Sequence, residues 1–550
     1  MRFASEFLSL SDLPGISALY LAYLSDYPRL APFYAGDPRS LEAVRAVAGR
    51  VEKRAYPRAE VASALRAQHA RWGGGPEGLT NIQALEEGAF VVFTGQQAGL
   101  FGGPLFTLYK AIAGLKLADK LTRELGRKVV GLFWMAADDH DFAEINHTFL
   151  PDKGNQLARI AYSPKHPPER QPESRMVLEG EIARAHQTLA ECLPTTEFRE
   201  AVLARLAECY SLGRTFPEAF ARWMMLLLGE KGMVVVDPSD PALKQAGKNA
   251  FRWEIETGSE SSNRIRKASD ELKKAGFHVQ VELREGGTNL FFYDGERHSV
   301  KKVGEEFEIH GKTFSRQEML ERIEQEPEQF SPNVALRPIY QDTLFPHIAY
   351  VGGPAEVAYY GEFKGSYEAA GLPMPVVFPR TTVSLIEPKI KAVFEKYHIG
   401  PKDLFSGLEP LITRLVEGKQ DPSADRELEV LEARLNESLD RWSKAAEQWD
   451  KSLLQAVSTS KGAIKHQLEG LAKKLTQAYK RKNEELVDQV RKAALHLLPE
   501  GTLQERAFPA VPYLVKYGFR FVEDLYESLD IERFQHQVIH LDYSSHNPLP

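Results

Sequence analysis

A glycine-rich loop between two predicted elements is the clearest place for a ligand in this chain. Residues 89–93 form a short apolar run typical of a strand, and Pro104 opens a helical pattern that extends to about Leu121. The loop between them, residues 94–103, reads TGQQAGLFGG. Glycines let the backbone approach a ligand, and the start of the following helix offers unpaired N–H groups to a phosphate or carboxylate. The loop matches neither GxGxxG nor a Walker motif, so a tightly packed structural turn is an equally good interpretation.

Two side chains on the predicted helix could reach an anion held by this loop. Thr107 and Lys110 lie within two turns of the helix start, and helical side chains lean toward the N-terminus. A lysine there would offset negative charge on the ligand. Without the glycine loop, Lys110 would be interpreted as a solvated surface lysine.

An acidic cluster follows the second predicted strand. Asp138, Asp139, His140 and Asp141 are consecutive, and open α/β sheets bind ligands outside the carboxyl ends of their strands. Such a cluster could hold Mg²⁺, bind a substrate ammonium group or act as a base toward an attacking amine. Asp141 with Glu144 also fits the acidic cap of a following helix, which would leave Asp138 and His140 to face the ligand.

A second glycine turn has the same design as the first. Residues 351–356 read VGGPAE, follow an apolar run and precede a helical pattern that carries Tyr359. Just upstream, Asn333, Arg337 and Gln341 are polar residues within an apolar stretch. A surface position is the more typical interpretation for any one of the three alone.

Composition and charge exclude several classes of function. The 550 residues include 69 Lys and Arg against 76 Asp and Glu, a formal net charge of −7, so no general excess of positive charge draws the chain to nucleic acid or an anionic membrane. No segment approaches the ~20 apolar residues of a bilayer span, and Glu6 and Asp12 stand where a signal peptide would be apolar. We therefore expect a cytoplasmic protein without nucleic-acid or membrane partners. Cys192 and Cys209 match no CxxC or metal spacing.

Five apolar runs predict the strands of one parallel sheet, at residues 89–93, 129–137, 233–236, 347–351 and 375–378. Their alternation with helical patterns indicates an α/β fold with crossover helices. We expect one core over residues 1–420, helical in its first eighty residues, with insertions at about 150–230 and 255–335. The second insertion should contain a hairpin formed by residues 278–283 and 289–293.

Residues 421–498 have a different character and are rich in Glu, Lys, Leu, Ala and Gln. Apolar residues recur there at steps of three and four along two stripes, which predicts an antiparallel coiled-coil hairpin with its turn at residues 458–462. The last residues, 499–550, are expected to pack back on the core. The exposed end of such a hairpin commonly finds a partner, so a homodimer is a hypothesis from this pattern.

Several motifs in the same order resemble the cysteine ligase family of bacillithiol biosynthesis. The resemblance covers nearly the whole chain, including the helical hairpin. Its motifs are TGQQAGL at 94–100, GPL at 103–105, YKA at 109–111, Trp134 with DDHDF at 138–142 and EIN at 144–146, RP at 337–338, QD at 341–342 and YVGGP at 350–354. Together they are far more specific than any one of them.

The resemblance implies a Rossmann-like core akin to nucleotidyltransferases and class I aminoacyl-tRNA synthetases, with two connecting insertions and a coiled coil that supports a homodimer. It also implies that cysteine is joined to the amino group of glucosaminyl malate. Because joining a carboxylate to an amine is uphill in water, the acid must be activated, most simply by ATP as an adenylate. ATP is thus the expected cofactor, and Mg²⁺ is a second candidate. The His-Ile-Gly-His signature of class I synthetases is absent, and residues 102–105 occupy the equivalent place.

Under this resemblance, the glycine loop and Thr107 would hold phosphate or carboxylate, and Lys110 would offset developing charge. Asp138 and His140 would orient or deprotonate the glucosamine amine. The expected catalytic residues are Lys110, Asp138, His140 and Asp141, and the expected substrate- and nucleotide-binding residues are Gln96, Gln97, Gly99, Gly102, Gly103, Thr107, Asn146, Arg337, Gln341, Gly352, Gly353, Glu356 and Tyr359.

Two other functions are compatible with the sequence. The same fold could serve a nucleotidyltransferase of another pathway, which would release pyrophosphate without ligation. Alternatively, the coiled coil could be the purpose of the chain and the core a nucleotide-binding scaffold without catalysis. Product analysis with ATP, cysteine and glucosaminyl malate separates the first from a ligase, and saturable nucleotide binding without turnover would favour the second.

Overall fold

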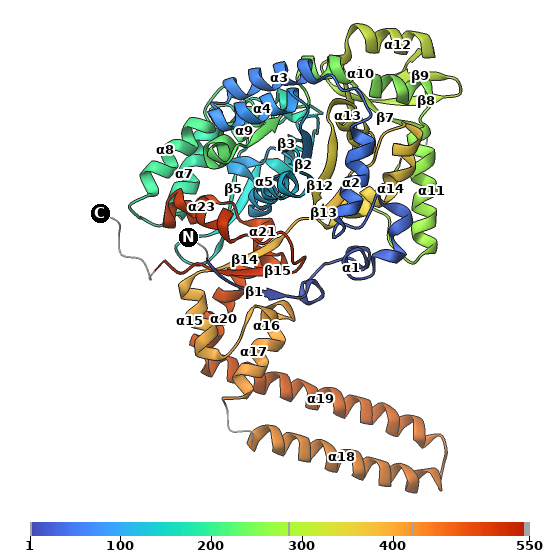
Figure 1. The fold of residues 1–550 in the computed structure, drawn as a ribbon. Helices are drawn as coiled ribbons and strands as arrows, with labels where there is room; N and C mark the ends of the chain where they lie inside the picture. The colour runs from blue at the N-terminus through green and yellow to red at the C-terminus, as the bar shows by residue number, and fades with distance from the viewer. Residues whose placement is uncertain (1–2, 169, 284–285, 420–422, 544–550) are drawn as a thin grey trace. The chain divides into compact units, whose positions relative to one another are not determined.

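Five parallel strands form the central sheet of the computed structural model, which describes residues 3–168, 170–283, 286–419 and 423–543. Their order is β13-β12-β2-β3-β6, and all adjacent pairs are parallel. Figure 1 shows β13, β12, β2 and β3 in this order. The strand of this sheet that comes first in the chain, β2, therefore lies in the middle, and the order reverses between β2 and β12, as in a Rossmann fold. The predicted strands and the α/β, Rossmann-like class are confirmed. The strands are β2 (Phe90–Gln96), β3 (Val129–Met135), β6 (Val234–Val236), β12 (His347–Gly352) and β13 (Val376–Pro379).

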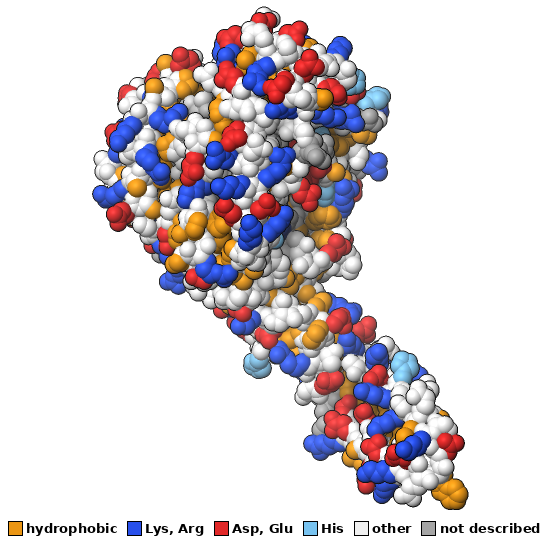
Figure 2. Space-filling view, turned by 90° about the vertical axis from the view of Figure 1, so that its right-hand side faces the viewer, with side chains coloured by type: hydrophobic (Ala, Val, Ile, Leu, Met, Phe, Trp, Pro, Cys, Tyr) orange, Lys and Arg blue, Asp and Glu red, His pale blue; other side chains and the backbone are white. Residues whose placement is uncertain are grey.

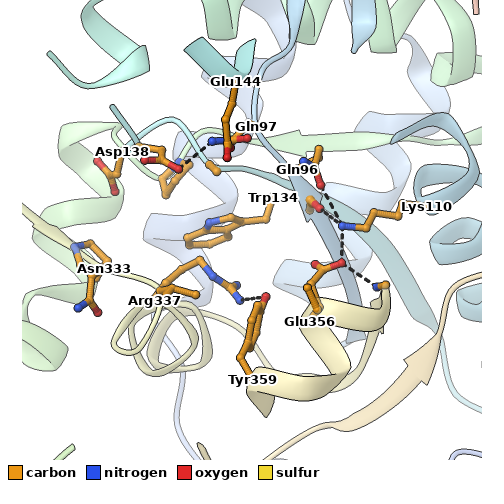
Figure 3. Close-up of a pocket in the computed structure, with 18 of the residues that line it drawn as sticks. Gln96, Gln97, Lys110, Trp134, Asp138, Glu144, Asn333, Arg337, Glu356 and Tyr359 are labelled. Atoms are coloured by element: carbon orange, nitrogen blue, oxygen red, sulfur yellow. Dashed lines mark hydrogen bonds and ion pairs between the residues drawn. The ribbon is translucent and has the colours of Figure 1, made fainter. Parts of the chain in front are cut away.

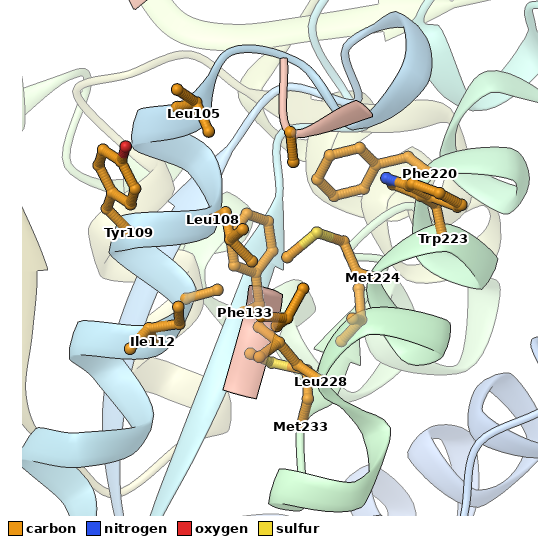
Figure 4. Close-up of a cluster of buried hydrophobic side chains, with 14 of the residues drawn as sticks. Leu105, Leu108, Tyr109, Ile112, Phe133, Phe220, Trp223, Met224, Leu228 and Met233 are labelled. Atoms are coloured by element: carbon orange, nitrogen blue, oxygen red, sulfur yellow. The ribbon is translucent and has the colours of Figure 1, made fainter. Parts of the chain in front are cut away.

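Both faces of this sheet are covered, which explains why its strands read as continuous apolar runs. All seven residues of β3 and all three of β6 are buried. In Figure 4, Leu108 of α5 (Leu105–Leu125) lies among Phe133 of β3 and Met224 of α9 (Phe216–Leu228). Full burial of each such side chain contributes about 1.5–3 kcal/mol. This cluster fixes α5, the helix that carries Lys110.

Two long connections leave this sheet and return to it. Between β3 and β6 the chain forms α6 (Phe142–Ile145), β4 (His147–Pro151), β5 (Leu157–Ala161), α7 (Ile182–Cys192), α8 (Arg199–Cys209) and α9. Between β6 and β12 it forms α10 (Pro241–Glu256), α11 (Glu260–Lys274), β7 (Gly287–Tyr293), β8 (Arg297–Val303), β9 (Glu306–Ile309), β10 (Lys312–Phe314), α12 (Arg316–Gln325), β11 (Phe330–Pro332) and α13 (Arg337–Leu344). The strands of this second connection form an antiparallel sheet of their own, in the order β10-β9-β8-β7-β11.

The hairpin predicted in the second connection has a different partner strand. β7 pairs with β8, and residues 278–283 have no regular secondary structure. The backbone N–H groups of Gln280 and Val281 instead donate to the Glu362 carboxylate, at 2.7 and 3.1 Å. Glu362 belongs to α14 (Pro354–Ala369) and is buried. These two N–H groups, which would pair with a neighbouring strand in a hairpin, thus bond to a side chain that is distant in sequence.

The two ends of the first unit meet in a third sheet. β15 (His536–His540) lies between β1 (Ala4–Leu8), to which it is antiparallel, and β14 (Thr382–Ile386), to which it is parallel. The strand β1 corrects the expectation that the first eighty residues are purely helical; its residues are mostly exposed and its hydrogen bonds come from the far end of the chain. The neighbouring helices are α1 (Ala18–Ser25), α2 (Leu41–Val51), α3 (Arg58–Arg71), α4 (Pro76–Glu86), α21 (Gln504–Ala507), α22 (Val511–Tyr517) and α23 (Arg520–Ser528).

The chain divides into two compact units, Met1–Ile386 with Gly501–Pro550, and Glu387–Glu500. The second unit contains the predicted coiled-coil hairpin, which is confirmed as α18 (Ser423–Glu447) and α19 (Leu453–Lys482). Its turn lies at residues 448–452, where the Asp450 carboxylate accepts the Ser452 N–H at 2.8 Å. The expected turn at 458–462 instead lies inside α19. The hydroxyl residues there fit a helix, since the Thr459 hydroxyl donates to the Gln455 carbonyl of the preceding turn. The other helices of this unit are α15 (Pro388–Tyr397), α16 (Pro401–Phe405), α17 (Leu408–Glu417) and α20 (Glu484–Leu497).

The surface carries both signs of charge. Basic and acidic side chains are interspersed over the face shown in Figure 2, in keeping with 69 basic and 76 acidic residues. Within the described ranges, no helix combines the length and the apolar character that a membrane crossing requires.

Candidate active site

A cavity of about 550 Å³ opens at the carboxyl ends of β2, β3 and β12. The strand order reverses at this point, where open α/β sheets bind their ligands. Gln96 ends β2, Asp138 follows β3, and Gly353 follows β12 (Figure 3). The remaining walls come from α5, α13, α14, α21 and the β7–β8 hairpin. The glycine loop and the acidic cluster therefore meet in one cavity.

A buried ion pair between Lys110 and Glu356 lies in one wall (Figure 3). The Lys110 ammonium also donates to the Gln96 side-chain carbonyl at 3.0 Å. Glu356 accepts the Tyr350 hydroxyl at 2.6 Å and the Gly353 N–H at 2.7 Å. Burial lowers the pKa of Lys110, although Glu356 acts in the opposite direction. Burial alone would raise the pKa of Glu356, but Lys110 and the two other donors together lower it.

Arg337 presents a guanidinium group that has no carboxylate partner among the described residues. One of its nitrogens donates to the Tyr359 hydroxyl at 3.1 Å and another to the Gln341 carbonyl at 3.2 Å. The group also lies 5.6 Å from the centre of the Tyr350 ring. Neutral partners thus hold the guanidinium in place without neutralising it. Its planar fork suits a ligand carboxylate or phosphate.

On the β3 side, Asp138 is paired with Lys244 of α10. The ammonium nitrogen lies 2.6 Å from the Asp138 carboxylate, and only 1% of the Lys244 side chain is exposed. Burial lowers the pKa of Lys244, although Asp138 opposes this effect. The pair holds Asp138 in a fixed orientation, and its negative charge is already offset.

His140 and Asp139 are held by the second connection and by the glycine loop. Arg297 donates to His140 Nδ1 at 3.0 Å and stacks over Phe291, 3.5 Å from the ring centre. Because arginine can only donate, this contact uses Nδ1 as the acceptor and goes with a neutral ring that carries its proton on Nε2. The Asp139 carboxylate lies 3.4 Å from the same Nδ1. Asp139 accepts the His140 N–H at 2.7 Å and the Gln97 amide at 2.9 Å. Burial would raise the pKa of Asp139, but the His140 side chain, the His140 N–H, Arg297 and the Gln97 amide together lower it.

Positive charge predominates in the cavity. The basic residues that line it are Lys110, Arg297, Arg337, Arg380 and Arg506, and the acidic ones are Asp138, Asp139, Glu144 and Glu356. Lys244 pairs with Asp138 and Glu505 with Arg380 from behind, so six positive charges stand against five negative ones. This balance favours an anionic ligand, even though the whole chain has a net charge of −7.

The structure brings nine of the expected site residues to this cavity, namely Gln96, Gln97, Lys110, Asp138, His140, Arg337, Gly353, Glu356 and Tyr359. They come from four separate regions of the sequence. The parallel sheet unites them because the carboxyl ends of its strands lie at one edge.

The second half of the glycine loop lies outside the cavity. A Cβ on Gly102 would lie 2.7 Å from the Trp223 indole, and one on Gly103 would lie 3.4 Å from the Thr107 hydroxyl. The Tyr210 hydroxyl accepts the Gly102 N–H and donates to the Gly99 carbonyl, both at 2.8 Å. The loop therefore uses its polar groups within the protein. The expectation that these three glycines hold a ligand is corrected, and the alternative of a tightly packed turn describes them.

The start of α5 is likewise closed to an anion. The Leu105 N–H donates to the Phe508 carbonyl at 2.7 Å, and the Thr107 N–H donates to the Pro104 carbonyl at 2.9 Å. Thr107 is fully buried and does not line the cavity. Its predicted contact with phosphate is corrected, because a segment from the end of the chain covers the helix terminus.

Four further expected residues support the site from outside its lining. Asp141 caps α6 by accepting the Glu144 N–H at 3.3 Å, as its structural interpretation predicts. Asn146 ends α6, and Gln341 supports Arg337. Gly352 is the last residue of β12. None of these four lines the cavity.

The acidic cluster does not form a metal site. In the described part of the chain, no three His, Cys, Asp or Glu side chains converge so that they could hold an ion. Asp138 is bound to Lys244, Asp139 to the Gln97 amide, and Asp141 to a helix N-terminus. Mg²⁺ needs several free oxygen ligands, so this donor set does not fit it.

Sequence reasoning missed several residues of the site. Arg297 and Phe291 come from the second connection, and no motif marks them. Glu173 of the first connection is fully buried behind the cavity, where its carboxylate accepts the Ala98 N–H at 3.0 Å and its own N–H donates to the Asp139 carbonyl at 2.7 Å. Glu173 thereby ties the loops after β2 and β3 together. Burial raises the pKa of Glu173 well above its ordinary value.

A Rossmann-like domain with a cationic pocket at its strand ends, followed by a helical coiled-coil domain, defines the class of this protein. The model of the family "Bacillithiol biosynthesis BshC, N-terminal Rossmann-like domain" matches residues 5–381, and that of its C-terminal coiled-coil domain matches residues 383–541. The chain therefore belongs to the BshC family of bacillithiol biosynthesis, which confirms the resemblance found in the sequence.

Relatives of this family are similar over nearly their whole length. A "Putative cysteine ligase BshC" from Salinibacter ruber is 36% identical over 95% of this chain and 96% of its own. Proteins of the same name from Koribacter versatilis and Symbiobacterium thermophilum are 32% and 33% identical, over 95% and 97% of this chain and 97% and 100% of theirs.

Proposed function

We propose that this protein is a ligase that joins the carboxylate of cysteine to the amino group of glucosaminyl malate, using ATP to activate the cysteine. The observation that supports this most directly is the pocket at the sheet's switch point. Charged side chains of both signs line it, and the positive ones, mostly arginines, are in excess. A ligase of this kind must bind an anionic nucleotide and an acceptor that carries carboxylates. The pocket's charge balance fits both requirements.

Arg337 is assigned to a carboxylate of the malyl group. Its guanidinium is fixed by Tyr359 and Gln341 and retains its full charge. Two parallel hydrogen bonds to a carboxylate would complete its coordination. Arg506, which contacts the Phe106 ring, is a second cation at this cavity.

Lys110 is assigned to the negative charge that develops when the cysteine carboxylate is activated. Its ammonium group is held by Glu356 and β2, so it needs no rearrangement during the reaction. His140 donates a hydrogen bond from Nε2 and orients a substrate, since Arg297 occupies its other nitrogen. We therefore assign His140 to orienting the substrate and not to deprotonating the amine.

Product analysis tests this assignment. The full chain is incubated with ATP, cysteine and glucosaminyl malate, and the amide is detected by mass spectrometry together with the nucleotide products. We expect one amide per ATP, with AMP and pyrophosphate if an adenylate forms and with ADP and phosphate if an acyl phosphate forms. Pyrophosphate release without an amide would indicate a nucleotidyltransferase and contradict the proposal.

We also propose that the coiled-coil hairpin forms a homodimer. Several of its large apolar side chains are exposed, namely Val430, Leu431, Trp442, Trp449, Leu453 and Leu471. Burying such a stripe against a second copy removes apolar surface from water. Light scattering at micromolar concentration should give twice the chain mass of 61.8 kDa. A mass of one chain would contradict this proposal.

A further inference from the structure

Glu144 is the carboxylate in this cavity that remains without a partner. It lies in α6, beside the acidic cluster, and is exposed to solvent at the cavity wall. Figure 3 shows its side chain directed from α6 toward Gln97 and the interior. No side chain among the described residues forms an ion pair or hydrogen bond with its carboxylate. We propose that Glu144 binds the amino group of the acceptor and takes the proton that this amine loses on attack, an inference that rests on the proposed function.

The other three carboxylates of the cavity are already engaged. Asp138 is paired with buried Lys244, and Glu356 with buried Lys110. Asp139 accepts hydrogen bonds from His140 and Gln97. A carboxylate whose negative charge is stabilised in this way is a weaker base, since protonation would leave the partner cation or donor unmatched. Protonation of any of the three would weaken a contact that shapes the site.

The nitrogen bases of the cavity are also occupied. His140 Nδ1 accepts from Arg297, and its Nε2 carries the ring proton. Lys110 is a cation held by Glu356 and by two carbonyl oxygens. Glu144 thus combines access to the cavity with a free carboxylate, and its position is fixed because Asp141 caps α6 at the Glu144 N–H.

The proposed step forms one bond, breaks one bond and moves one proton. The nitrogen of the neutral acceptor amine forms a bond to the carbonyl carbon of the cysteinyl adenylate, which cysteine and ATP supply. The bond between that carbon and the phosphate oxygen breaks, and AMP leaves with the electron pair. The nitrogen releases one proton to the Glu144 carboxylate. The cysteine ammonium keeps its protons and needs only a counter-charge, whereas the attacking amine needs an unpaired base.

The decisive variant is Glu144→Gln, which retains the shape of the side chain but cannot accept a proton. General-base catalysis contributes about 10²–10⁴-fold, so we expect amide formation to fall by at least about 100-fold. The Glu144→Asp variant should recover part of this loss. Cysteine-dependent exchange between ATP and pyrophosphate should stay within about twofold of the wild type, because adenylate formation needs no base for an amine. Glu230→Gln, an exposed glutamate of the 3₁₀ turn Gly229–Lys231, is the matched control and should change neither reaction.

Several results would overturn this role. Undiminished amide formation by Glu144→Gln would do so, and so would an equal loss of the exchange reaction and of amide formation. If the wild type exchanges pyrophosphate but makes no amide from glucosaminyl malate, the proposed function fails. The affinity of glucosaminyl malate, measured by calorimetry for the wild type and Glu144→Gln, then still tests the contact with the amine, and equal affinities would refute it.

Discussion

The buried pair of Lys110 and Glu356 allows a stringent test of how the site is built. In the variant Lys110→Met, the lysine is replaced by an uncharged side chain of similar length. Glu356 then remains in a site where only 15% of its side chain is exposed, and its remaining donors among the described residues are the Tyr350 hydroxyl and the Gly353 N–H. Removing one partner of a buried pair typically costs about 3–5 kcal/mol. The two remaining donors place the expected cost at the lower end, at about 3 kcal/mol at pH 7.

The double variant Lys110→Met with Glu356→Gln should recover most of this loss. The glutamine can still accept from Tyr350, and no unpaired charge remains buried. Replacing both partners of a buried pair is often close to neutral, so we expect the double variant to lie within about 1–2 kcal/mol of the wild type. Urea unfolding followed by Trp fluorescence gives the free energies, since Trp134 is part of the cavity wall.

The pH dependence gives this prediction a second test. In the wild type, the pKa of Glu356 is lowered on folding, so its stabilising contribution is present above the unfolded pKa and is lost as the pH falls through the folded pKa. In Lys110→Met, burial is no longer opposed by the ammonium group, and the pKa of Glu356 should rise. The destabilisation should therefore be largest near pH 7 and shrink toward pH 4. A double variant no more stable than Lys110→Met, or a cost that does not change with pH, would refute this reasoning.

Three further outcomes are expected. Gly102→Ala should lower the free energy of unfolding by about 2–4 kcal/mol, because φ is +92° and the new Cβ would meet Trp223. The ATP affinity of the folded variant should not change, and a selective loss of that affinity would restore the anion-binding interpretation. Glu173→Gln should gain stability relative to the wild type as the pH rises from 5 to 9. The wild-type carboxyl has a raised pKa in the folded state, so its contribution to stability is present below the unfolded pKa and is lost as the pH rises through the folded pKa. Urea midpoints whose difference does not change from pH 5 to 9 would contradict this. Arg337→Met should raise the KM for glucosaminyl malate by about 10–100-fold, because it removes a charged hydrogen-bonded contact that contributes about 1.5–3 kcal/mol. The KM for cysteine should not change, and an increase in the KM of both substrates would refute the assignment.

The sequence by itself determined the strands of the parallel sheet and several of the residues that meet at its carboxyl edge. Strands buried on both faces must be apolar throughout, so residues 129–135 and 234–236 can be recognised as apolar runs from the sequence alone. Parallel strands end at one edge, which is why the helix start that carries Lys110 and the strand end that precedes Asp138 could be predicted to share one site from their positions. The coiled coil could also be recognised from the sequence, because the spacing of its apolar residues is a local property of the chain.

Only the tertiary structure decided which of these groups are free to act. The glycine loop reads as an anion cradle, but Tyr210, Trp223 and the carbonyl of Phe508 occupy its donors and its space. Arg297 reaches His140 from a separate antiparallel sheet and determines which nitrogen carries the proton. These partners are distant in sequence and leave no periodic signal, because a hydrogen bond across the fold depends on where two chain segments meet.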